Sequence, residues 1–349
     1  MKRQPTTQEP WLFAPPESSI APEAVFTDEV ILEAAFHHFR AVGFPYRQLP
    51  RHACMQEINR LAQTDALSLL TTQTAYHVAD TYHPHRFHGA AIGMHSPYES
   101  FQDDALLRRT IRLHWEYGGS IQEDTLGKLA IVSGTQACSN FRPGFACLLY
   151  REYCQPGATV LDTSTGYGGR LVGFMASGIA GRYIGIDPST ATHAGNTRMA
   201  DELGFAERVA LYNLPAEDIT HDAVRGRCDF AFTSPPYFCK ERYCDEDTQS
   251  WKRYHTGEAW RDGFLRPMLA LQYAALKPGC YSLVNIEDVR IKTVTYPLVA
   301  WTVQCSREVG FVVTDTRKFL LAQRMGQGHE GAERATETVL VLQKPGVTP

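Results

Sequence analysis

Residues 157–187 read GATVLDTSTGYGGRLVGFMASGIAGRYIGID, and this stretch decides the fold. An apolar run ends at Asp162, glycines follow, a helix-length apolar segment comes next, and a second apolar run ends at Asp187. A strand, a glycine-rich turn, a helix and a second strand in this order form a unit of a parallel sheet. The stretch therefore predicts a Rossmann-like α/β fold, in which ligands bind beyond the carboxyl ends of the strands.

Short β-branched or aromatic runs continue towards the C-terminus, most of them separated by segments of helix length. They read RVALYNLPAED (208–218), CDFAFTSPPYF (228–238) and GCYSLVNIEDV (279–289). This alternation predicts a doubly wound, mostly parallel sheet with helices on both faces. FVVTDTRKFL (311–320) and TETVLVLQKP (336–345) are expected to add a final antiparallel pair.

The first 130 residues differ from the rest of the chain in composition and in the spacing of their apolar residues. Residues 1–26 contain many prolines and little periodicity, so an extended arm is expected there. Apolar spacing predicts helices over 28–42, 52–72 and 102–116. We therefore divide the chain into a mainly helical N-terminal region, residues 1–130, and an α/β domain, residues 131–349. The first would act as a lid or as an oligomerisation surface, and a homodimer is left open.

Composition narrows the class of protein. The net charge is −4, from 34 Lys and Arg against 38 Asp and Glu, and it does not favour a DNA-binding surface. A local basic patch is still compatible with this net charge. The chain has no apolar stretch long enough to cross a membrane and no secretory signal at its start, which predicts a cytoplasmic protein without a membrane partner.

Metal-ligand patterns are weak in this sequence. The nine cysteines form no Cys-x-x-Cys pair and are expected to be reduced thiols. His83, His85 and His88 cluster in the segment TYHPHRFHGA, but neither a carboxylate nor a cysteine completes an evident site. We predict no metal, and we expect these histidines to line or close a pocket.

The glycine-rich turn has a plain and a functional interpretation. It can be a tight strand-to-helix turn followed by a surface aspartate. It can also be a nucleoside site, with glycines that let the backbone approach the ligand and with Asp187 accepting hydrogen bonds from ribose hydroxyls. Its spacing, Gly166-x-Gly168-Gly169, does not match the dinucleotide pattern Gly-x-Gly-x-x-Gly. At the third strand end, Glu217 and Asp218 fit either a receptor for the amine of adenine or a helix N-cap.

The most informative segment runs from a buried strand straight into Ser234-Pro235-Pro236-Tyr237. Two prolines fix the backbone and make the turn stiff. The Ser234 hydroxyl and the Pro235 carbonyl can accept hydrogen bonds from a planar N–H group, and the Tyr237 ring can stack on it. Such a turn suits the positioning of an amide-like or aniline-like nitrogen, whose delocalised lone pair is a poor nucleophile.

This segment resembles the (D/N/S)-P-P-(Y/F) motif of the amino methyltransferases, best known for adenine-N6 and cytosine-N4 methylation of DNA. The resemblance spans roughly residues 138–290 and implies the class I methyltransferase fold with seven strands, S-adenosylmethionine as the cofactor, and Ser234 to Tyr237 as the catalytic turn. It implies cofactor contacts from the Asp162–Gly169 loop, from Asp187 and from Phe141-Arg142. The cofactor-binding residues expected in this way are Phe141, Arg142, Asp162, Thr163, Gly166, Gly168, Asp187, Glu217 and Asp218.

The chain departs from the family pattern in three ways. The cofactor loop has Asp-Thr-Ser-Thr where Asp-Pro-Phe is commoner, the cofactor motif precedes the catalytic motif, and the segment after Tyr237 is too short for the usual target-recognition domain. These departures concern the substrate more than the reaction. They favour a small nitrogenous metabolite such as the guanidine of L-arginine, with DNA cytosine-N4 or adenine-N6 as the alternative.

Residues 239–260, CKERYCDEDTQSWKRYHTGEAW, supply candidates for substrate binding. Carboxylates recognise planar guanidinium groups, so Asp245 and Glu246 are expected to face a cationic substrate, with Phe238 and Trp251 as apolar walls. The plainer interpretation is a solvated loop leading into a helix. A third reading of the whole chain, a nucleotide-binding module without catalysis, is disfavoured by the intact Ser234–Tyr237 motif.

Overall fold

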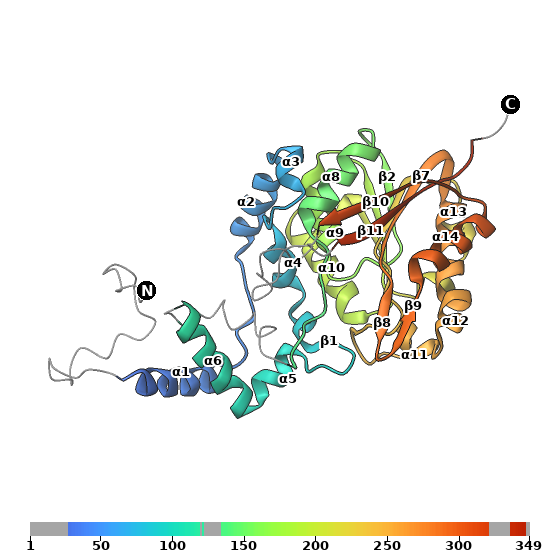
Figure 1. The fold of residues 1–349 in the computed structure, drawn as a ribbon. Helices are drawn as coiled ribbons and strands as arrows, with labels where there is room; N and C mark the ends of the chain where they lie inside the picture. Colours follow the sequence, from blue (N-terminus) through green and yellow to red (C-terminus); the bar gives the residue numbers. More distant parts are fainter. Residues whose placement is uncertain (1–26, 119–120, 122–133, 321–335, 347–349) are drawn as a thin grey trace.

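The computed structural model describes residues 27–118, 121, 134–320 and 336–346. Its centre is a seven-stranded sheet in the order β10-β11-β7-β5-β2-β3-β4 (Figure 1). Five neighbouring strands are parallel, while β11 runs antiparallel to both β7 and β10. The strands are β2 (Thr159–Asp162), β3 (Arg182–Ile186), β4 (Val209–Tyr212), β5 (Cys228–Thr233), β7 (Leu276–Ile286), β10 (Val312–Leu320) and β11 (Thr336–Gln343). The predicted doubly wound, mostly parallel sheet of seven strands is confirmed.

The chain reverses its direction of winding between β2 and β5. From β2 it continues outward through β3 to β4, and then returns to place β5 on the other side of β2. Crossovers leave from opposite faces at such a point, so the loops beyond the carboxyl ends diverge and open a crevice. The turn after β2 and the Ser234–Tyr237 turn after β5 therefore face one space.

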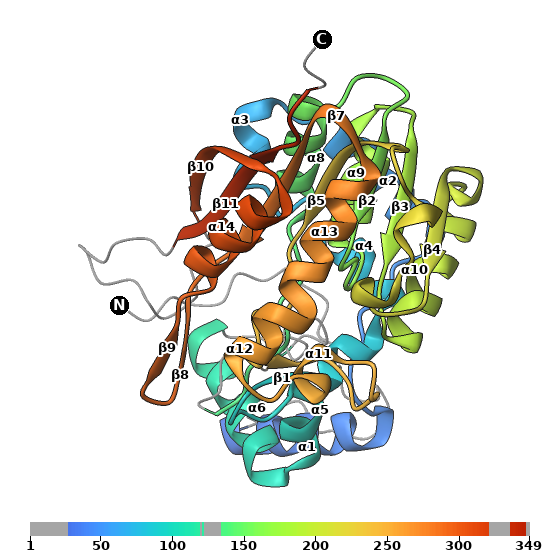
Figure 2. The ribbon, with the colours of Figure 1, turned by 90° about the vertical axis from the view of Figure 1, so that its right-hand side faces the viewer.

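Helices cover both faces of the sheet because strand residues alternate between the faces (Figure 2). Val160 and Phe230 point to one core, while Leu161 and Ala231 point to the other. The first core contains α8 (Pro143–Tyr153), α9 (Gly169–Ser177) and α10 (Thr190–Glu202). The second contains α12 (Gly257–Trp260), α13 (Arg266–Ala275) and α14 (Leu298–Val309).

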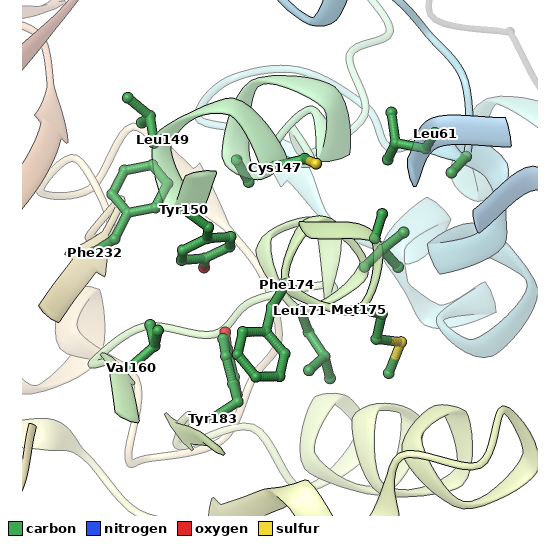
Figure 3. Packing of buried hydrophobic residues seen from close by; sticks show 14 of the residues in the cluster. Leu61, Cys147, Leu149, Tyr150, Val160, Leu171, Phe174, Met175, Tyr183 and Phe232 are labelled. Carbon is green, nitrogen blue, oxygen red and sulfur yellow. The ribbon is translucent and has the colours of Figure 1, made fainter. Parts of the chain in front are cut away.

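Aromatic side chains from helices and strands interlock in the first core, as Figure 3 shows. The ring of Phe174 lies 5.4 Å from that of Tyr183 and 6.0 Å from that of Tyr150. Tyr150 also meets Phe232 edge-on, with ring centres 5.9 Å apart. Large rings in edge-to-face contact bury much apolar area and hold α8 and α9 rigidly on the strands.

Part of the N-terminal region shares this first core. Helices α2 (Arg51–Ala62), α3 (Ala66–Leu69) and α4 (Tyr76–Tyr82) lie against α8, α9 and α10, and Ile58 and Leu61 belong to the same buried cluster as Leu171. The predicted helix over 52–72 is broken after Ala62, where Asp65 caps a new helix by accepting from the Ser68 N–H. The division of the chain near residue 130 stays a prediction.

Helices α1 (Asp28–Val42), α5 (Pro97–Gln102) and α6 (Asp104–Gly118) form a separate group, at one end of the molecule in Figure 2. Phe36, Phe39 and Ile111 are part of its small apolar core. The predicted helix over 28–42 is confirmed and ends at Gly43, which has a positive φ of 87°. The expected arm, residues 1–26, lies outside the described residues.

Short elements complete the described chain. They are η1 (Pro84–His88), β1 (Ala90–Ala91), η3 (Ala206–Arg208), η4 (Ala216–Asp218), η5 (His221–Ala223), β6 (Glu241–Arg242), α11 (Ser250–Arg253), the π-helical turn η6 (Arg261–Leu265), β8 (Val289–Ile291) and β9 (Val294–Tyr296). β1 pairs with β6, which ties the N-terminal region to the chain just after the Ser234–Tyr237 turn. Within the described ranges, no helix has the length and apolar character of a membrane span.

Candidate active site

A cavity of about 430 Å³ lies beyond the carboxyl ends of the parallel strands, where the winding reverses. The loops after β2, β3, β4 and β5 contribute to its wall, together with β7, β10, β11 and residues 73–76 and 136–145. The predicted site residues that line it are Phe141, Arg142, Thr163, Gly166, Asp187, Glu217, Ser234, Pro235, Pro236 and Tyr237. The structure thus brings the proposed cofactor half and the proposed catalytic turn into one space.

The turn after β2 needs its glycines. Gly166 and Gly168 have positive φ angles of 56° and 76°, which side chains with a Cβ adopt only with strain. A Cβ on Gly168 would meet Asn196 Oδ1 at 2.6 Å, and one on Gly169 would overlap the Phe141 carbonyl. Gly168 does not line the cavity itself; it lets α9 start close to α10, and Gly169 lets it start close to Asn140 and Phe141.

Asp162 is fully buried and does not line the cavity. Its carboxylate accepts from Arg170 Nε at 2.7 Å, from the Tyr183 hydroxyl at 2.6 Å and from Thr233 Oγ1 at 3.1 Å. These partners come from α9, β3 and β5, the elements on either side of β2. Asp162 was expected to contact the cofactor, but its oxygens are instead occupied in fixing the strand ends that carry the site.

Asp187 follows β3 and lines the cavity. Its two carboxylate oxygens accept from the backbone N–H groups of Gly166 at 2.8 Å and of Ser189 at 2.9 Å. Burial raises the pKa of Asp187 to about 6, although both backbone N–H groups act to lower it. The glycine turn therefore holds the carboxylate in a fixed orientation, with acceptor capacity left for a ligand hydroxyl.

Glu217 and Asp218 differ in their surroundings, although they are adjacent in η4. Asp218 lies outside the cavity lining and is bound by Arg253 at 2.9 and 3.0 Å. The side chain of Glu217 is only 5% exposed, and its Oε1 accepts from Arg253 at 3.0 Å and from the Tyr254 hydroxyl at 3.1 Å. Oε2 of Glu217 is buried and makes no hydrogen bond to the described residues. Burial raises the pKa of Glu217 above its ordinary value.

The Ser234–Tyr237 turn is braced by Asn285, at the end of the neighbouring strand β7. Asn285 Nδ2 lies 2.8 Å from the Tyr237 hydroxyl and 3.4 Å from Ser234 Oγ, and the hydroxyl donates to the Asn285 carbonyl at 3.2 Å. Asn285 Nδ2 also donates to Glu337 Oε2, on β11, at 2.9 Å. Burial raises the pKa of Tyr237 well above its ordinary value, so the hydroxyl stays neutral.

Sequence reasoning missed Asn285 and Glu337. Both line the cavity. The position of Asn285 at the end of a predicted strand was a usable signal, because carboxyl ends of parallel strands share one edge. Glu337 had no such signal, since it lies near the start of an antiparallel strand far along the chain.

The proposed substrate residues lie outside the cavity lining. Phe238 has a positive φ of 52°, is buried, and packs its ring 4.9 Å from that of Tyr296. Trp251 carries the cations of Arg242 and Lys252 over its ring, at 5.2 and 5.6 Å. Asp245 is exposed at the surface. Glu246 is occupied by the backbone N–H and the hydroxyl of Thr190, at 3.0 and 3.1 Å.

Phe141 and Arg142 directly precede α8. The Phe141 ring meets Phe232 edge-on at 5.3 Å, and Arg142 donates to the Leu70 carbonyl at 2.8 Å. Both residues line the cavity between the N-terminal helices and the sheet.

Two of the clustered histidines, His83 and His85, lie behind the cavity wall, while His88 stacks on Tyr98 with ring centres 4.1 Å apart. His83 is buried against the glycine turn, with Nδ1 2.9 Å from the Ala79 carbonyl, and burial lowers its pKa to about 4. His85 Nε2 lies 3.0 Å from the hydroxyl of Thr192, which does line the cavity. The described residues contain no group of three side chains suited to a metal. His83 and His85 therefore support the wall and do not form it.

Buried polar atoms test whether a nucleoside fits the cavity. Glu217 Oε2 and Gln249 Nε2 are both buried without a hydrogen-bond partner among the described residues, and both residues line the cavity. Native proteins rarely leave such atoms unpaired, because desolvation is then uncompensated. Together with the oriented carboxylate of Asp187, these atoms fit a ligand that has ribose hydroxyls and a polar base.

Comparisons with known proteins give a fold and no closer relationship. No family model and no curated protein matches the chain. Solved structures that match include a [4+2]-cyclase, SpnF (15% identity, 58% of this chain and 82% of that chain, TM-score 0.42). Others are a putative sarcosine dimethylglycine methyltransferase from Galdieria sulphuraria (12% identity, 57% and 82%, TM-score 0.39) and a 1,6-didemethyltoxoflavin-N1-methyltransferase from Burkholderia thailandensis (16% identity, 57% and 76%, TM-score 0.39).

The fold is Rossmann-like. A fold of this kind does not by itself determine a reaction.

Proposed function

We propose that this chain is an S-adenosylmethionine-dependent N-methyltransferase whose acceptor is a small N–H-rich metabolite, such as the guanidine of L-arginine. One observation carries the proposal: the Ser234–Tyr237 turn and the oriented carboxylate of Asp187 line the same cavity. The first suits a planar nitrogen, and the second suits the ribose of the cofactor.

The cofactor half rests on three groups. Asp187 would accept from ribose hydroxyls, Glu217 Oε2 would accept from the adenine amine, and the turn at Gly166 lets the backbone come close to the ligand. S-adenosylmethionine, when bound, supplies an electrophilic methyl group on a sulfonium sulfur. When the methyl group is transferred, the sulfur keeps the electron pair of the broken C–S bond. The acceptor nitrogen gains the methyl group and releases a proton.

The catalytic turn would position the acceptor nitrogen. Ser234 Oγ and the Pro235 carbonyl are acceptors for its N–H groups, and the ring of Tyr237 restricts the approach of a planar group. Asn285 holds the Tyr237 hydroxyl, so the ring keeps one orientation. Holding the nitrogen in line with the methyl group is the main contribution expected from these residues.

Glu337 favours a cationic acceptor over a nucleic-acid base. Its carboxylate lines the cavity and reaches the catalytic turn through Asn285, at 2.9 Å. Glu241, the other carboxylate on this side, is already engaged by Ser139 and by the Tyr243 hydroxyl. A carboxylate beside the transfer position binds a guanidinium or amine well. Arg142 and Lys240 also line the cavity, so Glu337 favours a cation through its place beside the turn and not through the net charge of the wall.

The acceptor can be tested with cofactor that carries a labelled methyl group. The purified full chain is incubated separately with L-arginine, with related guanidines and amines, and with duplex DNA, and a Tyr237→Ala variant serves as the control for background transfer. We expect label in arginine or a related small molecule. Transfer to DNA alone would refute the small-metabolite acceptor in favour of DNA methylation. Cofactor binding without transfer to any acceptor would favour the non-catalytic nucleotide-binding module.

A further inference from the structure

The segment after the catalytic turn, residues 244–254, is fastened to the proposed cofactor half of the cavity; we call it the clamp segment. Glu246 accepts from the Thr190 backbone N–H at 3.0 Å, at the first residue of α10. Thr248 Oγ1 donates to the Pro188 carbonyl at 3.2 Å, directly after Asp187. Arg253 binds Glu217 at 3.0 Å. These three bonds all end in the loops after β3 and β4, which carry Asp187 and Glu217.

The fastening places Gln249 in the cavity wall. Gln249 is 5% exposed, and its backbone N–H donates to the Glu246 carbonyl at 3.1 Å. Its side-chain Nε2 is buried and makes no hydrogen bond to any described residue. Thr248 and Ser250, on either side, line the same cavity. Holding an unpaired amide there costs free energy, which a ligand acceptor would recover.

Gln249 and Glu217 offer complementary groups to one ligand. Nε2 of Gln249 is a donor and Oε2 of Glu217 is an acceptor; both are buried in the same cavity and they are not bonded to each other. Adenine carries an amine donor next to ring-nitrogen acceptors, which matches this pair. A 6-oxopurine presents an acceptor in place of the amine, and it would oppose the carboxylate of Glu217.

We infer that Gln249 is a specificity-determining residue that, with Glu217, selects a 6-aminopurine over a 6-oxopurine in the cofactor. This inference rests on the proposed function, because it takes the cofactor to be a purine nucleoside. On this inference the clamp segment recognises the base of the cofactor. Its acidic residues had instead suggested that it binds the substrate. The segment thus connects the catalytic turn to the base of the cofactor.

The test measures binding and needs no methyl acceptor. Isothermal titration calorimetry gives the Kd of the full chain for S-adenosylhomocysteine and for S-inosylhomocysteine, its 6-oxo analogue. The wild type should bind the adenosyl compound more tightly. Gln249→Leu, which keeps the size and removes the donor, should weaken adenosyl binding about tenfold, as expected for one lost hydrogen bond. Glu217→Gln should narrow the preference between the two ligands, because its amide can donate to the 6-oxo group.

A matched control and a stability readout separate recognition from packing. Gln304→Leu makes the same change on the exposed side of α14 and should leave both Kd values unchanged. Gln249→Leu should keep or raise the Tm of the free protein, because it removes an unpaired buried amide. A fallen Tm with equal losses for both ligands would show a packing role and overturn the inference. An unchanged Kd of Gln249→Leu for S-adenosylhomocysteine would also overturn the inference, and it would leave the proposed function intact. If the wild type bound neither ligand, the proposed function itself would be overturned.

Discussion

The hydroxyl of Tyr237 lies 2.8 Å from the side-chain nitrogen of Asn285 and donates to the carbonyl of the same residue at 3.2 Å. Two adjacent parallel strands, β5 and β7, thus meet at their carboxyl ends through one tyrosine. The hydroxyl is engaged with the scaffold, so the ring is the part of Tyr237 that can act on an acceptor, which would share it with Lys240, whose Nζ lies 5.3 Å from the ring centre. The roles of the Tyr237 ring and of its hydroxyl can therefore be tested with separate variants.

Tyr237→Ala should lower kcat about 100-fold, since loss of the ring releases the acceptor from its aligned position. Tyr237→Phe keeps the ring and loses its bond to Asn285, so its kcat should fall by about tenfold or less. Methyl-transfer assays at saturating acceptor would measure both values. A Phe variant as impaired as the Ala variant would contradict a positioning role for the ring.

Asp187→Ala should have the opposite kinetic signature. Loss of the carboxylate removes charge-assisted hydrogen bonds to the ribose, so the Kd for S-adenosylhomocysteine should rise about 100-fold, at roughly 1.5–3 kcal/mol for each such bond. The kcat at saturating cofactor should change little. Calorimetry and steady-state kinetics on the same preparations give the comparison with Tyr237→Ala. Equal losses of cofactor affinity in the two variants would refute this division of roles.

Cofactor affinity should depend on pH through Asp187, whose pKa is raised to about 6 by burial. Ribose hydroxyls donate to the ionised form, so affinity is full above about pH 6 and falls as the pH drops through that value. The contribution of this carboxyl to stability has the opposite sign. Because its folded pKa exceeds its unfolded one, the free energy of unfolding decreases as the pH rises from about 4 to about 6. Kd values of the wild type and of Asp187→Asn between pH 5 and pH 8 would check the binding effect, which the Asn variant should lack.

Glu337→Gln should raise the KM for a cationic acceptor about tenfold, because the charge beside the catalytic turn is lost while an acceptor oxygen for Asn285 remains. The Kd for S-adenosylhomocysteine should not change. Glu258→Gln, at an exposed position of α12, is the matched control. A KM that is the same in wild type and Glu337→Gln would remove the argument for a cationic substrate.

Arg170→Met should destabilise the fold by about 3–5 kcal/mol, because it leaves the buried carboxylate of Asp162 without its cation. The exposed pair of Arg225 and Asp222 provides the control, and Arg225→Met should cost less than about 1 kcal/mol. Urea unfolding followed by circular dichroism measures both. Similar midpoints for the two variants would show that the Asp162 network does not hold the strand ends together.

Local patterns predicted most of the scaffold. The alternation at Val160 and Leu161 and the glycine turn after Asp162 reflect short-range physics, so the sheet and the Ser234–Tyr237 turn followed from the sequence. The other parts of the site depend on distant pairing. Asn285 and Glu337 meet because β11 pairs antiparallel with β7, and no local pattern distinguishes one glutamate from the others in the chain.

The acidic loop shows why charge alone was a poor guide. Its residues suggested a cationic partner, yet Glu246 binds the backbone N–H at the start of α10. A carboxylate satisfies a helix N-terminus as well as it satisfies a cation. Which partner it takes depends on tertiary contacts, and these are not visible in a stretch of twenty residues.

The core that α2, α3 and α4 share with α8 and α9 affects how the protein can be dissected. Close approach at Gly144, where a Cβ would meet Thr72 at 2.6 Å, leaves little space between these layers. A fragment that begins near residue 131 would lack Thr72 and Leu61, which cover α8 at Gly144, and an apolar face uncovered in this way promotes aggregation. Shortened versions that retain the chain from Arg51 onward would keep this interface covered.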